Sequence, residues 1–443
     1  MSHVTTHAGL DALRATLIDH VQYNAARLGV EVGTATPGLA LSNLIARTAL
    51  RHGERVVVLV DEYDKPMLDN MHDPDMAVAC RVELRDFYVR IKASDEHVRF
   101  VFLTGISKFS KMGVFSTLNN LEDISMDDRY AAMLGYTEEE LVTYFDGHIG
   151  RAAAKLGMTK EGLVSAMRDY YDGFSFDGHT MLYNPFSTLH FLNNPRFTNY
   201  WFESGTPSFI ARYMKDRKLT VEEFRGMEVP RDFVSSPGEI ETATAAGFLY
   251  QAGYLSLRPG RLDDYSLDYP NHEVHSAMSK LLCHNLLGEK ALSQSRSRMK
   301  ELLLKRDVDG VVQQFNQLLA AIPYDDYAAS ARAAAYFTDP TMGPREWLYR
   351  STLYSFLLGI GLDVEAETHT SKGRSDMVVK FWNQVWVIEV KVAKESKDVA
   401  NAADEAIRQI IEKGYADKFA GAVLLGVAID DEHRAIGEHR ARV

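Results

Sequence analysis

Three side chains near the C-terminus have the types and the spacing needed to hydrolyse a phosphodiester bond. Asp376 follows Gly-Arg-Ser, and Glu389 and Lys391 stand two residues apart in the segment Val-Ile-Glu-Val-Lys. Metal-assisted hydrolysis needs acids that hold Mg²⁺, a group that helps a water lose its proton, and positive charge near the developing oxyanion. The three side chains offer all of these, so the sequence predicts a site that cleaves phosphodiesters with Mg²⁺ or Mn²⁺.

A hairpin would bring these side chains to one face of a sheet. Glu389 and Lys391 point the same way because side chains alternate along a strand. If Asn383-Gln384 forms a two-residue turn, Asp376 lies opposite Lys391. The same register places Val378 opposite Glu389, and directly paired residues share a face, whereas a shift by one residue would turn Asp376 away. The alternative is an amphipathic edge hairpin with a surface ion pair between Asp376 and Lys391.

The elements that must position this site read as a small α/β domain. Apolar residues at helical spacing predict a helix from Pro344 to about Gly361. The segments that follow predict strands at 362–368, 375–382 and 385–392, a helix from about Val399 to Gly414, and a strand at 419–428.

A second candidate site lies near the N-terminus. The apolar run Arg55–Val60 is typical of a buried parallel strand and ends in Asp61-Glu62. Nucleotide hydrolases direct such an Asp to Mg²⁺ and the Glu to the attacking water. A second buried-strand candidate, Arg99–Leu103, ends at Thr104. The phosphate-binding signature G-x-x-x-x-G-K-[ST] needs a Gly-Lys pair, and the chain contains none, so ATP hydrolysis by this chain alone is not expected.

The remaining sequence alternates between strand and helix at first and then becomes mostly helical. Helical spacing at 8–29, 39–52 and 75–94 surrounds the two strand candidates, which predicts crossover units on a parallel sheet. From about Thr137 the chain is expected to be helical, with a hairpin at Phe174–Tyr183 that turns at Asp177-Gly178. Residues 271–339 are again expected to be helical.

Composition narrows the class of protein. The 443 residues are 46% hydrophobic and 25% charged, which is ordinary for a globular protein, and the length predicts two or three domains. A net charge of −12 argues against nonspecific coating of nucleic acid through a basic surface. No apolar run is long enough to cross a bilayer, and Cys80 and Cys283 lack metal-type spacing, so the prediction is a cytoplasmic protein with no membrane contact.

Several motifs then occur in a fixed order: VVVLVDEYDKPMLDN, FLTGISKFSKMGVFSTLNNLEDIS, GYTEEEL, YYDGFSF, YNPFS, YWFESGTP, and the C-terminal segments described above. From about Leu39 to its end the chain resembles bacterial AAA-ATPase-like proteins with a C-terminal PD-(D/E)xK nuclease-like domain. In that family a phosphate loop, typically Arg-Arg-Phe-Gly-Lys-Ser, precedes these motifs. We expect this chain to begin after the phosphate loop. Either the chain is a fragment, or its start was assigned too late, or the site has decayed.

The resemblance implies roles for single residues. Asp376 and Glu389 match the metal ligands, and Lys391 matches the lysine that orients the water or stabilises charge. Glu346 matches an acid from the preceding helix, although an acid in a first turn also favours the helix dipole, and Gln409 matches a glutamine that helps to place the substrate. At the N-terminal site, Asp61 and Glu62 match the acids for Mg²⁺ and water, and Thr104 matches a polar residue that senses phosphate.

The combined prediction is an α/β protein in three parts. Residues 1–136 form a truncated AAA-type P-loop NTPase-like core, 137–339 a helical middle, and 340–443 a PD-(D/E)xK restriction-endonuclease-like domain. The expected partner is nucleic acid, with DNA favoured over RNA, and the oligomeric state is open. Two alternatives are a non-catalytic interaction protein with both sites degenerate, and an ATPase completed in trans by phosphate contacts from another chain.

Overall fold

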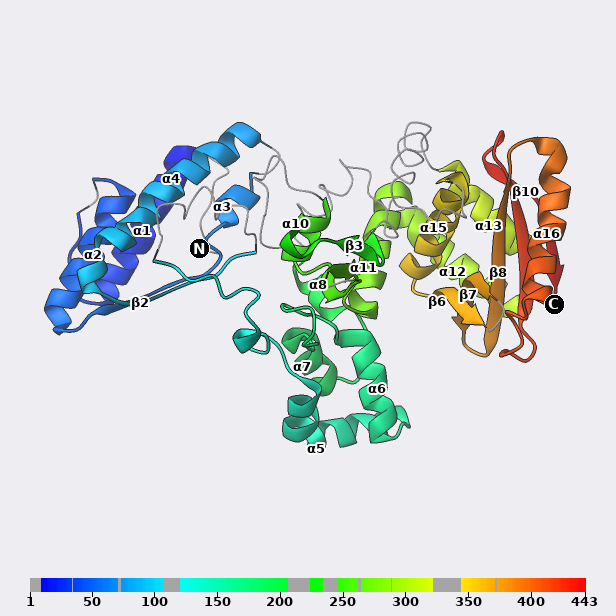
Figure 1. The fold of residues 1–443 in the computed structure, drawn as a ribbon, viewed down its shortest axis with the longest axis horizontal. Coiled ribbons are helices and arrows are strands. Elements are labelled where there is room, and N and C mark those ends of the chain that lie inside the picture. The colour runs from blue at the N-terminus through cyan, green and yellow to red at the C-terminus, as the bar shows by residue number, and fades with distance from the viewer. Residues whose placement is uncertain are drawn as a thin grey trace. The chain divides into compact units, whose positions relative to one another are not determined.

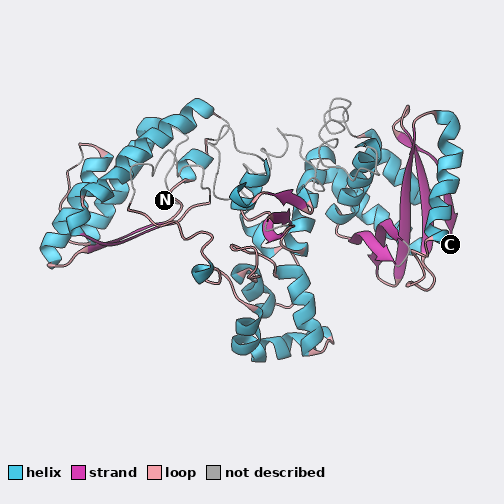
Figure 2. Ribbon diagram, viewed as in Figure 1, coloured by secondary structure: helices cyan, strands magenta, loops and turns pink. Residues whose placement is uncertain are grey.

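The computed structural model describes residues 9–443 except 34, 71–72, 107–119, 206–223, 234–244, 262–263, 288, 322–343 and 371–372. The chain divides into two compact units, whose elements are drawn in Figures 1 and 2. The first comprises Met1–Thr137, Phe174–Leu182 and Glu228–Asp268, and the second comprises Glu138–Gly173, Tyr183–Met227 and Tyr269–Val443. The division into three domains at 136 and 339 stays a prediction.

The first unit begins with helices packed on a pair of parallel strands. The helices are α1 (Leu10–Arg27), α2 (Pro37–His52), α3 (Lys65–Leu68), α4 (Pro74–Ala93) and the 3₁₀ turns η1 (Asp95–His97) and η2 (Asp128–Tyr130). Strands β1 (Val56–Val60) and β2 (Val98–Leu103) pair in parallel, and Val60 lies beside Leu103. One face of the pair packs on buried residues of α1, α2 and α4. The predicted strands, helices and parallel pairing are confirmed here.

A small three-stranded sheet follows, where mainly helix was expected. It has the order β3–β5–β4, formed by β3 (Met227–Val229), β5 (Tyr265–Asp268) and β4 (Ser256–Pro259), with α10 (Ala245–Gln251) and η4 (Arg231–Phe233) beside it in sequence. Its strands β4 and β5 are antiparallel. The predicted reversal at 174–183 is present, and an antiparallel bridge between Phe174 and Leu182 closes it without regular strands on either side. Its turn is present, since Gly178 has φ 83° and donates its N–H to Ser175 Oγ.

The second unit is helical before its C-terminal sheet. Its helices are α5 (Glu138–Leu156), α6 (Lys160–Tyr171), α7 (Pro185–Asn193), α8 (Tyr200–Gly205), α11 (His272–Leu287), α12 (Glu289–Lys305) and α13 (Val308–Ala320). Side chains cap several of them: Thr159 Oγ1 accepts from Gly162 N–H, and Asn184 Oδ1 accepts from Ser187 N–H. The helical middle is thus confirmed over these ranges, and 322–339 lies outside the described residues.

The C-terminal sheet has five strands in the order β10–β9–β8–β7–β6. Helix α15 (Pro344–Gly359) leads into β6 (Asp363–Thr370), β7 (Gly373–Phe381) and β8 (Gln384–Ala393), and η5 (Ser396–Asp398) and α16 (Val399–Glu412) lead into β9 (Val423–Asp430) and β10 (Ala435–Arg442). Strands β8 and β9 are parallel, and the other pairings within this sheet are antiparallel. The α/β fold class is as predicted, and β10 is an additional strand.

The two faces of this sheet are covered by different helices (Figure 1). Trp386, Ile388 and Val390 face a core shared with α12, α13 and α15. Val387 faces the opposite side and packs with Ile410 of α16. This strict alternation fixes which residues of β8 lie under α16.

A glycine in β9 lets α16 lie directly on the sheet. A Cβ atom at Gly426 would stand 2.5 Å from the backbone nitrogen of Ile407 and 2.9 Å from Ala406 Cβ. Gly426 is also the neighbour of Glu389 in the β8–β9 ladder. The helix therefore comes closest to the sheet beside a site residue.

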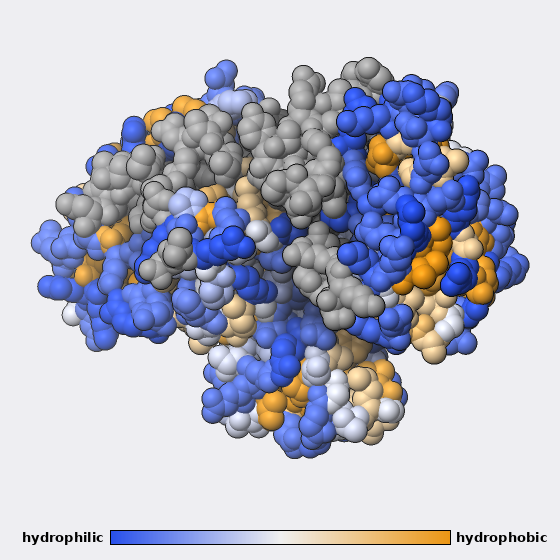
Figure 3. All heavy atoms as spheres, turned by 45° about the vertical axis from the view of Figure 1, so that its right-hand side comes forward, coloured by the Kyte–Doolittle hydropathy of each residue, from blue (hydrophilic) through white to orange (hydrophobic). Residues whose placement is uncertain are grey.

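On the face shown in Figure 3, exposed apolar side chains form separate small patches within a mostly hydrophilic surface. Across the described residues, every helix is too short or too polar to span a lipid bilayer. Cys80 is a buried free thiol.

Replacing Gly426 by alanine is expected to destabilise the C-terminal sheet by about 1–3 kcal/mol, the usual cost of overpacking a close contact. Thermal and urea unfolding followed by circular dichroism measure the change. Gly147→Ala is the matched control, because its methyl would meet only Arg151 Nη1 at 3.7 Å on an exposed helix. A Gly426→Ala protein as stable as this control would show that α16 shifts away without cost.

Candidate active site in the C-terminal sheet

The β7–β8 hairpin places Asp376 beside Glu389. Its turn residues are Trp382 and Asn383, and Phe381 pairs with Gln384. The expected turn at Asn383-Gln384 and the expected pairing of Asp376 with Lys391 are therefore wrong. The ladder runs to Met377 with Ile388, which aligns Asp376 with Glu389. The register differs from the expected one by two residues, and an even shift keeps every side chain on its predicted face.

Two side chain to backbone hydrogen bonds tie the carboxylates together at the end of this ladder. The Asp376 N–H donates to Glu389 Oε2 at 3.2 Å. The Val390 N–H donates to Asp376 Oδ2 at 2.7 Å. Asp376 is 8% exposed and Glu389 is 1% exposed. Both carboxylates are thus buried and oriented by the backbone of the partner strand.

Helix α16 supplies a third polar contact to this pair. Gln409 Nε2 donates to Glu389 Oε1 and lies 3.4 Å from the hydroxyl oxygen of the buried Tyr415. Gly414, with φ 63°, follows the helix end in the left-handed conformation and brings Tyr415 back under α16. The structure therefore places the Gln409 side chain beside Glu389, and its expected role in placing the substrate stays a prediction.

Helix α15 contributes two charged side chains one turn apart. Glu346 Oε1 lies 3.6 Å from Lys391 Nζ. Arg350 Nη1 donates to Asp376 Oδ1 at 3.1 Å, and this ion pair is largely buried. Residues four apart share a helix face, so Glu346 and Arg350 reach the hairpin together. Sequence reasoning missed Arg350, although its spacing from Glu346 was the available signal.

The electrostatics of the site follow from burial of like charges. Burial and the neighbouring Asp376 carboxylate raise the pKa of Glu389 to about 9. Burial also raises the pKa of Glu346, against the opposing effect of Lys391. Burial alone would lower the pKa of Lys391, but the carboxylates of Glu346, Glu389 and Asp376 together raise it. Lys391 is therefore a cation at neutral pH, and Glu389 holds a proton in the absence of a further positive charge.

These donors fit a hard divalent cation. Carboxylate oxygens are the ligands that Mg²⁺ and Mn²⁺ prefer, and Asp376 and Glu389 present them from adjacent strands on one face. A buried carboxylate whose pKa is raised by a second carboxylate gains most from a cation between them. The arrangement combines two metal-type ligands with a fixed ammonium group.

The candidate residues of the N-terminal site also come together. Asp61 and Thr104 follow the ends of the paired strands β1 and β2, and Thr104 Oγ1 donates to Asp61 Oδ1 at 2.5 Å. Glu62 has φ 55°, an uncommon backbone conformation for a residue other than glycine. Its Oε2 is buried and makes no hydrogen bond within the described part of the chain. Three polar groups thus gather at the carboxyl edge of the parallel pair.

Other acidic and basic candidates lie outside the hairpin site. Glu365 is exposed and forms an ion pair with Lys380, and the side chain of Glu367 lies outside the described residues. Lys394 and Lys397 are exposed, and Lys397 pairs with Glu395 at 2.5 Å.

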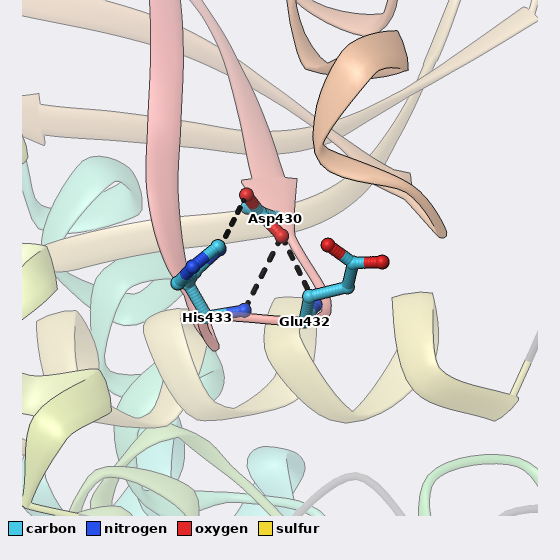
Figure 4. Close-up of side chains that lie close together, drawn as sticks. All are labelled: Asp430, Glu432 and His433. Carbon is cyan, nitrogen blue, oxygen red and sulfur yellow. Dashed lines mark hydrogen bonds and ion pairs between the residues drawn. The ribbon is translucent and has the colours of Figure 1, made fainter.

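A cluster at the β9–β10 turn combines Asp430, Glu432 and His433 (Figure 4). Asp430 Oδ1 accepts the N–H groups of Glu432 and His433 at 3.0 and 3.2 Å, and its Oδ2 lies 2.9 Å from His433 Nδ1. Ser396 Oγ donates to Asp430 Oδ2 at 2.7 Å. These bonds lower the pKa of Asp430 to about 2, with the Ser396 bond foremost. These hydrogen bonds stabilise the turn between β9 and β10, which explains why the three side chains lie together.

Comparison with known proteins gives two matches to families and one to a single protein. A family described as predicted AAA-ATPase matches residues 2–115, and the PD-(D/E)XK nuclease superfamily matches residues 344–439. The chain is also similar to an uncharacterized protein in the vnfD 5′ region of Azotobacter chroococcum mcd 1. The two are 35% identical over 433 residues, which is 96% of this chain and 79% of that protein.

The raised pKa of Glu389 predicts a pH-dependent stability in the presence of a chelator. Between the ordinary pKa of 4.5 and about 9, the folded state binds a proton that the unfolded state releases, so stability falls as pH rises through this window. A pKa that differs by one between the folded and unfolded states changes the free energy of unfolding by about 1.4 kcal/mol. A glutamine at position 389 cannot ionise, so Glu389→Gln removes the fall in stability with rising pH. At pH 8 the free energy of unfolding of the variant is expected to exceed that of wild type by more than about 1.4 kcal/mol.

Urea unfolding with EDTA at pH 5 and pH 8 tests this expectation, and Glu365→Gln serves as the exposed control. Equal pH dependence in wild type and Glu389→Gln would contradict the assignment of the bound proton.

Proposed function

The chain belongs to the family that joins a predicted AAA-ATPase-like domain at the N-terminus to a PD-(D/E)XK nuclease superfamily domain at the C-terminus, and from this we propose that its C-terminal site is a metal-dependent nuclease. The observation that carries the proposal is the buried pair of Asp376 and Glu389 with Lys391 on the same face of the hairpin. The substrate is a nucleic acid phosphodiester, with DNA favoured over RNA.

Each side chain of the site has a task in this reaction. Asp376 and Glu389 would hold a divalent cation, Mg²⁺ or Mn²⁺, and this cation would supply activation of a water and stabilisation of charge on the phosphoryl oxygens. Lys391 keeps its proton and donates a hydrogen bond to a phosphoryl oxygen as negative charge develops there. Glu346 orients Lys391 from α15, and Gln409 fixes the rotamer of Glu389 from α16.

The charge of the chain limits how it meets its substrate. With a net charge of −12, long-range attraction to nucleic acid is weak. Binding then depends on local cations at the site, and Lys391 with the exposed Lys394 supplies them along β8 and the segment that follows it. A protein of this kind needs a substrate that is delivered or concentrated near it. A cytoplasmic location remains a prediction from the scattered cysteines.

The N-terminal site supports a second, narrower proposal. Asp61, Glu62 and Thr104 follow the carboxyl ends of two parallel strands, where nucleotide hydrolases carry their acids for Mg²⁺ and water. The chain, however, has no Gly-Lys pair to bind β- and γ-phosphates. We propose that this site does not hydrolyse ATP in the chain alone. The unsatisfied Oε2 of Glu62 is an acceptor that an attacking water could satisfy once phosphate contacts from another chain complete the site.

Cleavage is expected without ATP when labelled single- and double-stranded DNA and RNA are incubated with Mg²⁺ or Mn²⁺. Asp376→Ala should abolish it, because one of two metal ligands is lost, with a rate reduction of at least about 10²-fold. Glu365→Gln is the matched control, since Glu365 is an exposed acid of the neighbouring strand β6 and should leave the rate unchanged. Cleavage that persists in Asp376→Ala would assign the activity elsewhere. Binding of nucleic acid without cleavage by any of the proteins would favour a non-catalytic interaction protein.

Nucleotide binding gives a separate test of the N-terminal site. Millimolar Mg·ATP is expected to leave the thermal midpoint of the chain unchanged, since ligand stabilises only by binding the folded state. Differential scanning fluorimetry with wild type and Asp61→Asn measures this. A midpoint that rises with Mg·ATP in wild type and stays constant in Asp61→Asn would overturn the proposal that the lone chain lacks a nucleotide site.

A further inference from the structure

Arg350 lies in the candidate active site, and none of the proposed chemistry has used it. Its Nη1 donates to Asp376 Oδ1 at 3.1 Å, and the side chains of Arg350 and Asp376 are only 14% and 10% exposed. We propose that the Arg350 guanidinium occupies the position beside Asp376 that a metal ion would take. When the metal binds, the arginine side chain moves away from Asp376 and contacts the substrate phosphate. This inference rests on the proposed nuclease function, and it assigns the arginine as a residue that couples metal binding to substrate binding.

The two cations compete for one oxygen. Asp376 Oδ2 accepts the Val390 N–H at 2.7 Å, so Oδ1 is the oxygen better placed to accept a metal, and Oδ1 is the atom that Arg350 contacts. Mg²⁺ binds carboxylate oxygens at about 2.0–2.1 Å in strict octahedral geometry. A guanidinium nitrogen at 3.1 Å would then stand within a few ångströms of a doubly charged ion, a strongly repulsive arrangement in a buried site.

The charges around Asp376 lead to the same conclusion. The cations of Arg350 and Lys391 contact the carboxylates of Asp376 and Glu346, and Glu389 lies beside Asp376. A divalent cation between Asp376 and Glu389 would add positive charge next to Arg350. A phosphodiester carries one negative charge, so it would compensate the charge of the displaced arginine.

Arg350 has the chemistry and the position for the second contact. A guanidinium presents a planar fork of donors that matches phosphate oxygens in two parallel hydrogen bonds. Arg350 projects from the same face of α15 as Glu346, which contacts Lys391. A rotation of the arginine side chain away from Asp376 would then let Arg350 and Lys391 contact one phosphate.

Calorimetric titration of the full chain with Mn²⁺ tests the competition. Arg350→Gln is expected to bind Mn²⁺ roughly tenfold more tightly than wild type, the change that about 1.4 kcal/mol produces. Arg345→Gln is the matched control, because Arg345 lies on the same helix and pairs with Asp431, and its Mn²⁺ affinity should equal that of wild type. Arg350→Lys keeps the charge and should bind Mn²⁺ as wild type does.

Adding dimethyl phosphate, a phosphodiester anion without a base, tests the transfer. It is expected to tighten Mn²⁺ binding several-fold in wild type, less in Arg350→Lys and least in Arg350→Gln, where only the metal and Lys391 would contact the phosphate. If Arg350→Gln does not fold, the reduced coupling in Arg350→Lys decides the question, and coupling equal to wild type would overturn the transfer.

The outcomes separate this inference from the nuclease proposal. Mn²⁺ binding that is lost in Asp376→Asn but equal in wild type and Arg350→Gln would overturn the role of Arg350 alone. Mn²⁺ binding that does not depend on Asp376 would overturn the nuclease site and this inference with it.

Discussion

The C-terminal domain depends on burying two carboxylates next to each other. Asp376 and Glu389 face one another across β7 and β8, with almost no exposure to solvent. Such a pair is unfavourable unless protons, hydrogen bonds or cations compensate it. The surrounding groups do so: the backbone of each strand donates to the carboxylate of the other, Gln409 donates to Glu389, and Arg350 pairs with Asp376. The helices on both faces of the sheet are positioned to deliver these groups.

This constraint also requires close packing of α16 on the sheet beside the site. Gln409 reaches Glu389 only because α16 lies close to β9, and α16 lies close because Gly426 has no side chain. On the opposite face, Trp386, Ile388 and Val390 anchor β8 in the apolar core. The strand that carries Glu389 and Lys391 is thus fixed on one face by apolar burial and on the other by polar contacts, which holds the site rigid before any substrate binds.

Sequence periodicity was sufficient for most elements of the C-terminal domain and for the face on which Asp376 lies, but it did not determine the register. The expected turn at Asn383-Gln384 missed the observed one by one residue, because Trp382 adopts a positive φ that its residue type does not suggest. A turn displaced by one residue shifts the register of the two strands by two residues. Such a shift keeps every side chain on the same face of the sheet, so the predicted orientation of Asp376 is still correct. The spacing of Arg350 from Glu346 indicates a shared face of α15, but its contact with Asp376 joins residues 26 apart through a helix–sheet crossing, which the spacing does not show. Likewise β10 carries polar residues such as Glu438 and Arg440, and as an edge strand it lacks the apolar run that identified β8.

The chemistry that these contacts permit is shaped by the acidic character of the chain. A nuclease that bound nucleic acid through a broad basic surface would hold it at any time, with or without metal. Here the net charge is −12, and the groups of the site are balanced when Glu389 keeps its proton. Under the proposed function, a divalent cation that displaced that proton would strengthen the attraction of Lys391 and Lys394 for a phosphate. Cleavage competence and substrate affinity would appear together, because the same buried carboxylates that make the metal-free site neutral make the metal-bound site positive.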